Sequence, residues 1–144
     1  MEILDIKESL RSEEILPILA ESVYMPTVEK LNARAESYMN NSKVTVLGAS
    51  KDDKFCGIIV MENREGKELY ILDIAVLKGN QKQGIGHAMI TYVQEIYRPS
   101  CIIAETDDDA VNFYRKIGFK VKGLGEKYPG ITRYECKYFK CSKE

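Results

Sequence analysis

The spacing of apolar and polar positions along the chain alternates between two periods, one typical of β-strands and one typical of α-helices. In the first half these periods predict a strand over residues 3–7, helices over 12–23 and 27–40, and strands over 44–49, 55–62 and 69–77. The second helix begins just after Pro26, and the charged sequence Lys51-Asp52-Asp53-Lys54 forms a turn between two strands. Connections this short predict that the last three of these strands form an antiparallel meander.

A glycine-bearing loop separates this half from a second one, in which helical and extended segments alternate. There the pattern predicts a helix over residues 84–98, a strand over 100–106, a helix over 109–117, and strands over 119–121 and 132–139. The first helix and the strands on either side of it form a β-α-β unit, whose strands run parallel through a right-handed crossover. The predicted fold class is therefore mixed α/β, with a mostly antiparallel sheet of about six or seven strands, one parallel crossover and helices on both faces.

Composition places the chain among ordinary globular proteins. Its 144 residues are the length of one domain, so we expect residues 1–144 to form a single domain. Hydrophobic residues make up 44% and charged residues 30%, which excludes a disordered or low-complexity protein. The formal net charge of −1 gives no general attraction to nucleic acid or to an anionic membrane, and we expect neither as a partner.

Cysteine and histidine usage bears on metals and on the cellular compartment. The cysteines, Cys56, Cys101, Cys136 and Cys141, form no CxxC pair, and His87 is the single histidine of the sequence. This pattern excludes a disulfide framework and a zinc or histidine-rich site, so we expect no metal. The first residues lack a basic segment followed by an apolar one, and no run approaches the ~18 apolar residues of a membrane span. We expect a cytoplasmic protein with reduced thiols.

One segment with candidate chemistry lies where an apolar strand turns into a helix, and it reads Gln81-Lys82-Gln83-Gly84-Ile85-Gly86-His87-Ala88. Gly84 and Gly86 allow a positive φ or a close approach of the backbone to a ligand, and the first N–H groups of a helix have no acceptor within it. These groups, with Lys82 at the rim, predict a phosphate-binding turn. A turn without a ligand is the alternative. Met89 replaces the third glycine of a dinucleotide-binding motif, and there is no GK[ST] sequence of a P-loop.

A second motif follows the next predicted strand and reads Ala110-x-x-Phe113-Tyr114-x-Lys116-x-Gly118-Phe119. Together with Gln81-x-x-Gly84-x-Gly86 after the strand that ends Ile74-Ala75-Val76, it resembles the GNAT family of acyl-CoA-dependent N-acetyltransferases. The resemblance is detailed from residue 69 onward and covers the first 65 residues only by the order and length of their elements. Asp107 departs from the pattern, because the family often has asparagine at this position.

The resemblance implies acetyl-CoA as the cosubstrate and assigns residues to it. The pyrophosphate of coenzyme A would lie on the main-chain N–H groups from Gln83 to Ala88, and the pantetheine arm would pair with a strand backbone beside a splay in the sheet. The cofactor-binding residues that it implies are Ile74, Ala75, Val76, Gln81, Lys82, Gln83, Gly84, Ile85, Gly86, His87, Ala88 and Asn112.

The resemblance also implies residues for the chemistry. Tyr114 matches the family's proton donor to the departing thiolate, since a phenol with a pKa of about 10 is protonated at neutral pH. The alternative is that Tyr114 only packs on the sheet. Asp73 interrupts an apolar strand, where an unpaired carboxylate would be costly. It either meets the acceptor amine in a wet cleft, as a ligand or as a base, or forms a structural hydrogen bond. Glu105, near the end of the neighbouring strand, is the second candidate.

These assignments predict transfer of an acetyl group to a primary amine, on a small molecule or a peptide, by direct attack in a ternary complex. The rival hypothesis is a non-catalytic acyl-CoA-binding regulatory module. The acidic cluster Asp107-Asp108-Asp109 has a simpler expected role, which is to cap the N-terminus of the following helix. A homodimer is an assembly that the resemblance allows.

Overall fold

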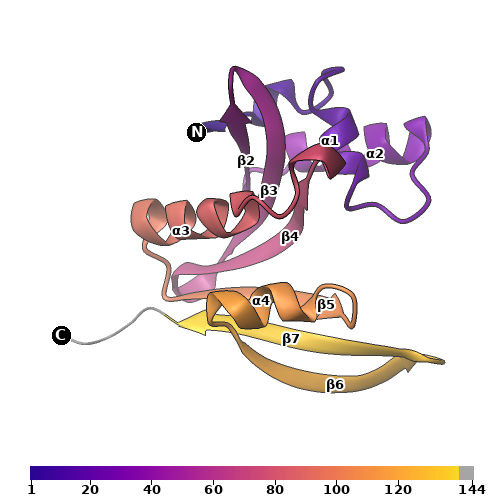
Figure 1. Cartoon of the computed structure of the whole chain (residues 1–144), viewed down its shortest axis with the longest axis vertical. Helices are drawn as coiled ribbons and strands as arrows, with labels where there is room; N and C mark the ends of the chain where they lie inside the picture. The colour runs from indigo at the N-terminus through magenta and orange to yellow at the C-terminus, as the bar shows by residue number, and fades with distance from the viewer. Residues whose placement is uncertain (140–144) are drawn as a thin grey trace.

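The computed structural model describes residues 1–139, with Lys127 and Tyr128 described by their backbone alone, and Cys141 lies outside this part of the chain. The strands are β1 (Glu2–Asp5), β2 (Val44–Lys51), β3 (Lys54–Arg64), β4 (Glu68–Val76), β5 (Cys101–Asp107), β6 (Lys120–Tyr128) and β7 (Ile131–Phe139) (Figure 1). The α-helices are α1 (Leu16–Ala20), α2 (Val28–Met39), α3 (Ile85–Tyr97) and α4 (Val111–Ile117), and the 3₁₀ turns are η1 (Lys7–Ser9), η2 (Glu65–Lys67) and η3 (Lys78–Asn80).

The strands form a seven-stranded sheet in the order β1-β2-β3-β4-β5-β7-β6. The neighbouring strands β4 and β5 pair in parallel and are connected by α3, and the remaining neighbours pair antiparallel. The predicted meander and the predicted β-α-β unit are therefore both confirmed.

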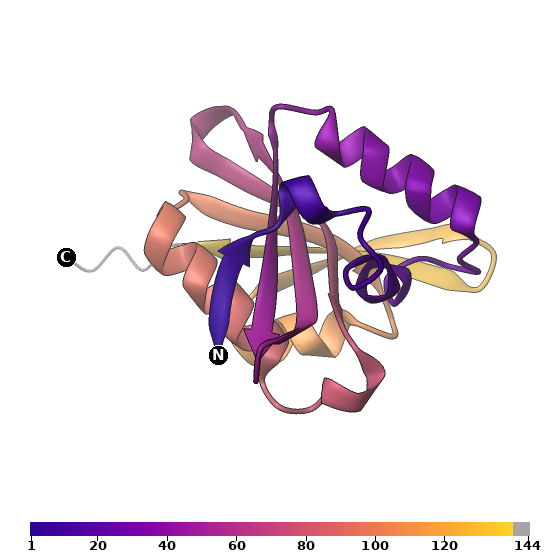
Figure 2. The same ribbon diagram turned by 90° about the horizontal axis from the view of Figure 1, so that it is seen from above.

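Helices cover both faces of this sheet, as the sequence predicts (Figure 2). Residues of α3 and α4, including Met89 and Tyr114, close one hydrophobic core, and residues of α1 and α2, including Ile18 and Ala35, close the other. We refer to these as the α3/α4 face and the α1/α2 face. In both cores the apolar stripe of each helix packs against the inward positions of the strands.

A β-bulge interrupts β4 in the middle of the sheet. Consecutive residues of β3 face Asp73 and Ile71, so Leu72 is the additional residue on β4. The bulge reverses the alternation of side chains: Ile71 and Ile74 both pack in the α3/α4 core, although they are three residues apart. Asp73 is thereby turned toward α1 and α2.

The sequence predictions were wrong at the N-terminal boundaries. The predicted strand over residues 3–7 ends at Asp5, whose carboxylate accepts a hydrogen bond from the N–H of Lys7 at 3.0 Å and turns the chain into η1. The predicted helix over 12–23 is reduced to α1, because the preceding residues form turns in which Ser12 Oγ accepts from the N–H of Ile15 at 3.2 Å. Pro17 in the first turn of α1 is compatible with this late start.

Two further predictions were wrong near the C-terminus. β6 extends to Tyr128 rather than ending at residue 121, because register shifts near Gly125 accommodate its glycines within the pairing with β7. The acidic cluster does not cap α4, whose N-cap is Ala110 with no side-chain hydrogen bond. Instead Asp107 Oδ1 accepts from the N–H of Asp109 at 3.0 Å and closes a turn ahead of the helix.

Candidate active site

An opening between β4 and β5 is the structural basis of the site. Parallel pairing runs from Glu68 and Cys101 to Tyr70 and Ile103, and no pairing continues beyond these residues in the described part of the chain. The N–H of Leu77 donates to Cys56 O on β3 at 2.8 Å, so the main-chain groups of Leu77 point toward β3 in this antiparallel pair. Because such pairs alternate, the main-chain groups of Ile74 and Val76 point away from β3 and into the opening.

A cleft of about 650 Å³ occupies this opening. It is lined by Glu21, Ile74, Ala75, Val76, Asn80, Gln81, Lys82, Gly84, Ile85, Gly86, His87, Asp109, Ala110, Phe113, Tyr114, Lys116 and Ile117. The cleft brings together both sequence motifs, and it also reaches Glu21 at the end of α1, on the other face of the sheet. Among the predicted site residues, Gln83, Ala88, Asn112, Asp73 and Glu105 are not part of the lining.

The first turn of α3 presents main-chain N–H groups to this cleft. Gly84 is the N-cap residue with φ 79°, and the first helical hydrogen bond runs from the N–H of Ala88 to Gly84 O at 2.9 Å. The N–H groups of Ile85, Gly86 and His87 precede this bond and have no acceptor within the helix. With the helix dipole behind them, these amides are oriented as an anion-binding site requires, and their role in binding stays a prediction.

Gly86 has a packing role that the sequence did not indicate. It lies within α3, and a Cβ atom built on it would be 2.9 Å from ring atoms of Phe113. The residue therefore allows α4 to pack closely on α3, and the expected approach of a ligand to its backbone stays a prediction. The positive φ that we expected among these glycines is at Gly84.

Side chains around the turn make protein contacts that the motif alone does not indicate. Gln81 Nε2 donates to Val76 O at 3.0 Å, across the mouth of the opening. Lys51 Nζ donates to Gln83 Oε1 at 3.0 Å, which brings a cation from the β2–β3 turn to the loop before α3. Asn112 Oδ1 accepts from Arg115 Nη1 at 3.1 Å on the exposed side of α4.

Tyr114 is held rigidly at the wall of the cleft. The residue is 4% exposed, and its ring packs edge-on against Phe113 and Phe119, with ring centroids 5.0 and 5.1 Å away. Burial, followed by the nearby Cys136 and Asp73, raises the pKa of the Tyr114 phenol well above its ordinary value. The hydroxyl is therefore protonated at neutral pH and can donate a hydrogen bond.

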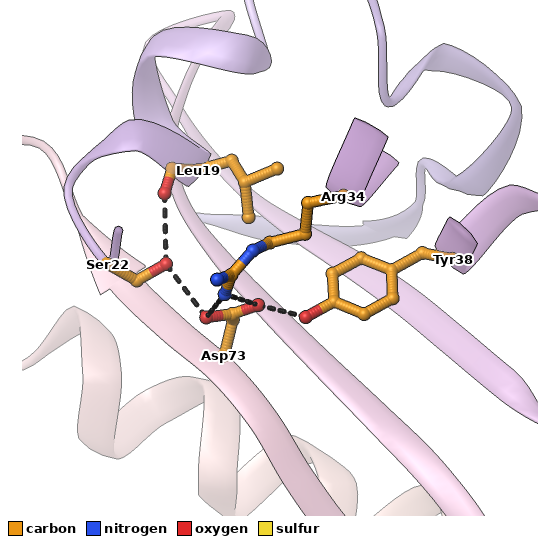
Figure 3. Close-up of polar contacts among 5 residues, drawn as sticks. All are labelled: Leu19, Ser22, Arg34, Tyr38 and Asp73. Atoms are coloured by element: carbon orange, nitrogen blue, oxygen red, sulfur yellow. Dashed lines mark hydrogen bonds and ion pairs between the residues drawn. The ribbon is translucent and has the colours of Figure 1, made fainter. Parts of the chain in front are cut away.

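Asp73 is paired, and its partners come from α2 and from the chain after α1 (Figure 3). It accepts from Ser22 Oγ at 3.0 Å, from Arg34 Nη1 at 3.0 and 3.2 Å, and from the hydroxyl of Tyr38. The Asp73 side chain is only 5% exposed, and burial together with Asp73 raises the pKa of Tyr38. Of the two alternatives that the sequence left for Asp73, a wet cleft or a structural hydrogen bond, the structure shows the second. We call these four residues the Asp73 cluster.

Sequence reasoning missed the partners of Asp73. The available signal was the spacing of Arg34 and Tyr38, which are four residues apart on a predicted helix and so share one face. A buried carboxylate needs a cation or several donors, and this face carries both. Nothing in the sequence places that face over β4.

Glu105 lies on β5 beyond the last residue that pairs with β4. Its neighbours Ile102 and Ala104 pack in the α3/α4 core, so the alternation of side chains directs Glu105 to the α1/α2 face. There the hydroxyl of Tyr70 is hydrogen-bonded to the carboxylate of Glu105. Burial and this carboxylate raise the pKa of Tyr70. The guanidinium of Arg64 stacks on the Tyr70 ring at 3.9 Å.

The acidic cluster at the end of β5 is engaged in local contacts. Besides the turn made by Asp107, Asp108 Oδ1 accepts from the hydroxyl of Tyr134 on β7 at 2.5 Å. These contacts tie the loop before α4 to β7. Asp109 lines the cleft.

Within residues 1–139, no group of three or more His, Cys, Asp or Glu side chains could hold a metal ion. No helix in this part of the chain is long and apolar enough to cross a membrane.

A family model described as an acetyltransferase (GNAT) domain matches residues 10–135, and thus both motifs, the opening and the Asp73 cluster. The chain belongs to the GNAT acetyltransferase family. The enzyme class predicted from the motifs, an acyl-CoA-dependent acetyltransferase, is thereby confirmed, and so is the predicted fold. A comparison with curated proteins finds no match to this GNAT enzyme.

Solved structures with the same fold are distant in sequence. An aminoglycoside 6'-N-acetyltransferase complexed with coenzyme A is 14% identical, with 100% of this chain and 99% of that chain covered and a TM-score of 0.79. The aminoglycoside 6'-N-acetyltransferase from Enterococcus faecium is 17% identical, with 100% and 99% covered and a TM-score of 0.77. The ribosomal-protein-S18-alanine N-acetyltransferase from Escherichia coli is 17% identical, with 99% and 96% covered and a TM-score of 0.74. At these identities the likeness concerns the fold alone.

Proposed function

We propose that this GNAT enzyme transfers the acetyl group of acetyl-CoA to a primary amine by direct attack within a ternary complex. The observation that carries the proposal is the cleft itself, which joins the free amides of α3 to Tyr114 and reaches Glu21 on the opposite face. A cofactor can enter from the α3/α4 face while an amine approaches from the α1/α2 face. The two substrates would then meet in the opening between β4 and β5.

In this proposal the α3/α4 side holds the cofactor. The pyrophosphate lies on the N–H groups of Ile85, Gly86 and His87, and Lys51 and Lys82 add positive charge beside it. The pantetheine arm forms hydrogen bonds with the main chain of Ile74 and Val76, as an added strand would. For this pairing, Val76 O exchanges its bond to Gln81 for one to the cofactor.

The chemistry needs a group that donates to the leaving sulfur and a group that accepts a proton from the amine. The amine nitrogen attacks the thioester carbonyl carbon, the C–S bond breaks, and the sulfur leaves with the electron pair. Tyr114 donates its hydroxyl hydrogen to this sulfur, and Glu105 takes a proton from the amine. The protonated amine gives up two protons: the first goes to Glu105 before attack and then to water, and the second leaves the nitrogen after attack and returns to Tyr114 through water. One proton therefore ends on sulfur and one in solvent, so the transfer is balanced. Asp73 is not assigned the role of base, because its oxygens already accept from three side chains.

The deciding experiment is a turnover screen with acetyl-CoA and four amines: spermidine, kanamycin, free lysine and a peptide with N-terminal alanine. The aminoglycoside and the peptide represent the substrates named for the structural neighbours. Released CoA is followed with an aromatic disulfide reagent. We expect release with at least one amine and a Tyr114→Phe variant with lower kcat and unchanged affinity for CoA. Calorimetric binding of CoA without release by any amine would favour the non-catalytic binding module.

We also propose a cytoplasmic location, which is supported by the free thiols of the described cysteines Cys56, Cys101 and Cys136. A homodimer stays a prediction. Its test is light scattering, and the edge strands β1 and β6 are the available pairing surfaces.

A further inference from the structure

The segment that contains α1 and α2 borders the acceptor side of the cleft. Glu21 lines the cleft, and the next residue, Ser22, bonds to Asp73 beside the β4 bulge. Tyr24 follows Glu21 by three residues and is therefore at most about 11 Å away from it along the chain. The connection between α1 and α2 thus starts at the lining of the cleft, and we call it the α1–α2 wall.

This wall is braced and presents apolar side chains to solvent. Lys30 Nζ donates to Met25 O at 3.1 Å, and Thr27 caps α2 by accepting from the N–H of Lys30 at 3.1 Å. Met25 has a φ of 48°, a conformation that costs a non-glycine residue free energy and persists where its surroundings hold it. Tyr24 is 85% exposed and Met25 is 66% exposed. A rigid segment with exposed apolar groups beside a catalytic opening is suited to contact a substrate.

The Asp73 cluster fastens this wall to the reaction centre. Ser22 lies just after α1, Arg34 and Tyr38 lie on α2, and all three donate to one carboxylate on the central strand. A single buried carboxylate therefore joins the chain after α1 and the helix α2 to the central strand β4.

The energetics of buried ion pairs argue that this cluster serves more than stability. The Asp73 side chain is 5% exposed and that of Arg34 is 39% exposed, so the desolvation of Asp73 in particular offsets part of their attraction. Apolar residues of similar volume often stabilise a core as well as a buried ion pair does. A shared carboxylate does something that apolar residues cannot do, because it fixes the orientation of three hydrogen-bond donors at once.

We propose that the Asp73 cluster is a positioning device that holds the α1–α2 wall in the geometry that binds the acceptor amine, with Arg34 as its main positioning residue. The proposal rests on the function proposed above. Its consequence is that the cluster determines the KM of the acceptor, and neither the affinity for CoA nor the intrinsic rate of transfer depends on it.

The test compares Arg34→Met, Arg34→Lys and Asp73→Asn with the control Lys7→Met. Lys7 Nζ donates to Asn41 O and Val44 O, each at 2.7 Å, so its loss also removes two part-buried hydrogen bonds. These bonds connect η1 to Asn41 after α2 and to Val44 at the start of β2, and none of the four residues of the Asp73 cluster takes part in them. The acceptor is the amine of the four-member panel that the wild-type enzyme acetylates fastest.

We expect Arg34→Met to raise the acceptor KM by about tenfold or more, the scale of one charge-assisted hydrogen bond, with kcat changed less than about threefold. Asp73→Asn should behave alike, and Arg34→Lys should recover part of the loss. The dissociation constant of CoA should be the same in all variants. Lys7→Met should lower Tm and leave the acceptor KM unchanged.

Four outcomes would overturn the proposal. If the acceptor KM were unchanged in Arg34→Met, the cluster would contribute only to stability. The same conclusion would follow if Lys7→Met raised the acceptor KM as much as Arg34→Met does. A fall of kcat by about a hundredfold in Asp73→Asn, at constant KM, would instead make Asp73 the base. Absence of turnover by the wild-type enzyme with every amine would overturn both this proposal and the proposed function, which separates the two failures.

Discussion

Gly86 on α3 lies directly against the ring of Phe113 on α4, and a Cβ atom on the glycine would come within 2.9 Å of that ring. The two helices carry the two halves of the proposed site, because α3 provides the anion-binding amides and α4 carries Tyr114. Their close packing therefore sets the separation between the pyrophosphate site and the phenol.

Gly86→Ala should disturb this separation. The added methyl group overpacks the contact with Phe113, so we expect a loss of about 1–3 kcal/mol in the free energy of unfolding and a reduced kcat. Urea denaturation and the CoA-release assay measure the two effects. Gly79→Ala is the matched control, because a Cβ atom there meets nothing within 4 Å. If the two variants had the same free energy of unfolding and the same kcat, the contact between residue 86 and Phe113 would accommodate the added methyl group without cost.

Gly84→Val should weaken the binding of CoA as well as the fold. A side chain at φ 79° costs about 1–2 kcal/mol, and a β-branched one also crowds the amides of the first turn of α3. Gly130→Val in the β6–β7 turn carries the same strain at φ 78°, away from the cleft. Both variants should lose stability, and only Gly84→Val should lose about tenfold or more in CoA affinity by calorimetry. A similar CoA affinity in both would argue against binding at these amides.

Local sequence features were sufficient to predict the elements that carry the cofactor side of the site. The helical stripe from Ile85 to Val93, the glycines before it and the motif around Tyr114 are each contained in short segments, and α3 and α4 form where these segments lie. The β-α-β connection then fixes the parallel pairing of β4 and β5.

The acceptor side could not be predicted in the same way, because it depends on a backbone irregularity and on distant partners. The apolar sequence of β4 gives no sign of the bulge at Leu72, yet this bulge turns Asp73 to the α1/α2 face. Arg34 is 39 residues before Asp73, and no local pattern pairs them. Gly123 and Gly125 indicated a loop, whereas long-range pairing with β7 makes them part of β6.

Stability at alkaline pH should depend on the buried phenols. The pKa of Tyr114 is raised in the folded state, so the folded protein retains this proton after the unfolded chain has lost it. The contribution of Tyr114 is therefore complete below its unfolded pKa of about 10 and is lost as the pH rises further. Tyr114→Phe should flatten the fall in the free energy of unfolding between pH 9 and 11, measured with urea. The exposed Tyr24→Phe is the control, and an unchanged slope in Tyr114→Phe would contradict the burial of the phenol.

Glu105→Gln tests the proposed base. Glutamine keeps the size and can bond to Tyr70, but it cannot take a proton from the amine, so we expect kcat at pH 7 to fall by about a hundredfold. CoA affinity should be unchanged. Raising the pH toward the pKa of an alkyl amine, about 10, should restore much of the loss, because an amine that is already neutral needs no base.

The control for this experiment is Tyr70→Phe, which removes the hydroxyl beside Glu105 and keeps the carboxylate. We expect its kcat to stay within about threefold of the wild-type value. If Glu105→Gln retained full activity at pH 7, or stayed equally slow at pH 7 and pH 9.5, the carboxylate would not be the proton acceptor. Since Asp73 is already bonded to Ser22, Arg34 and Tyr38, deprotonation of the amine would then fall to water in the cleft.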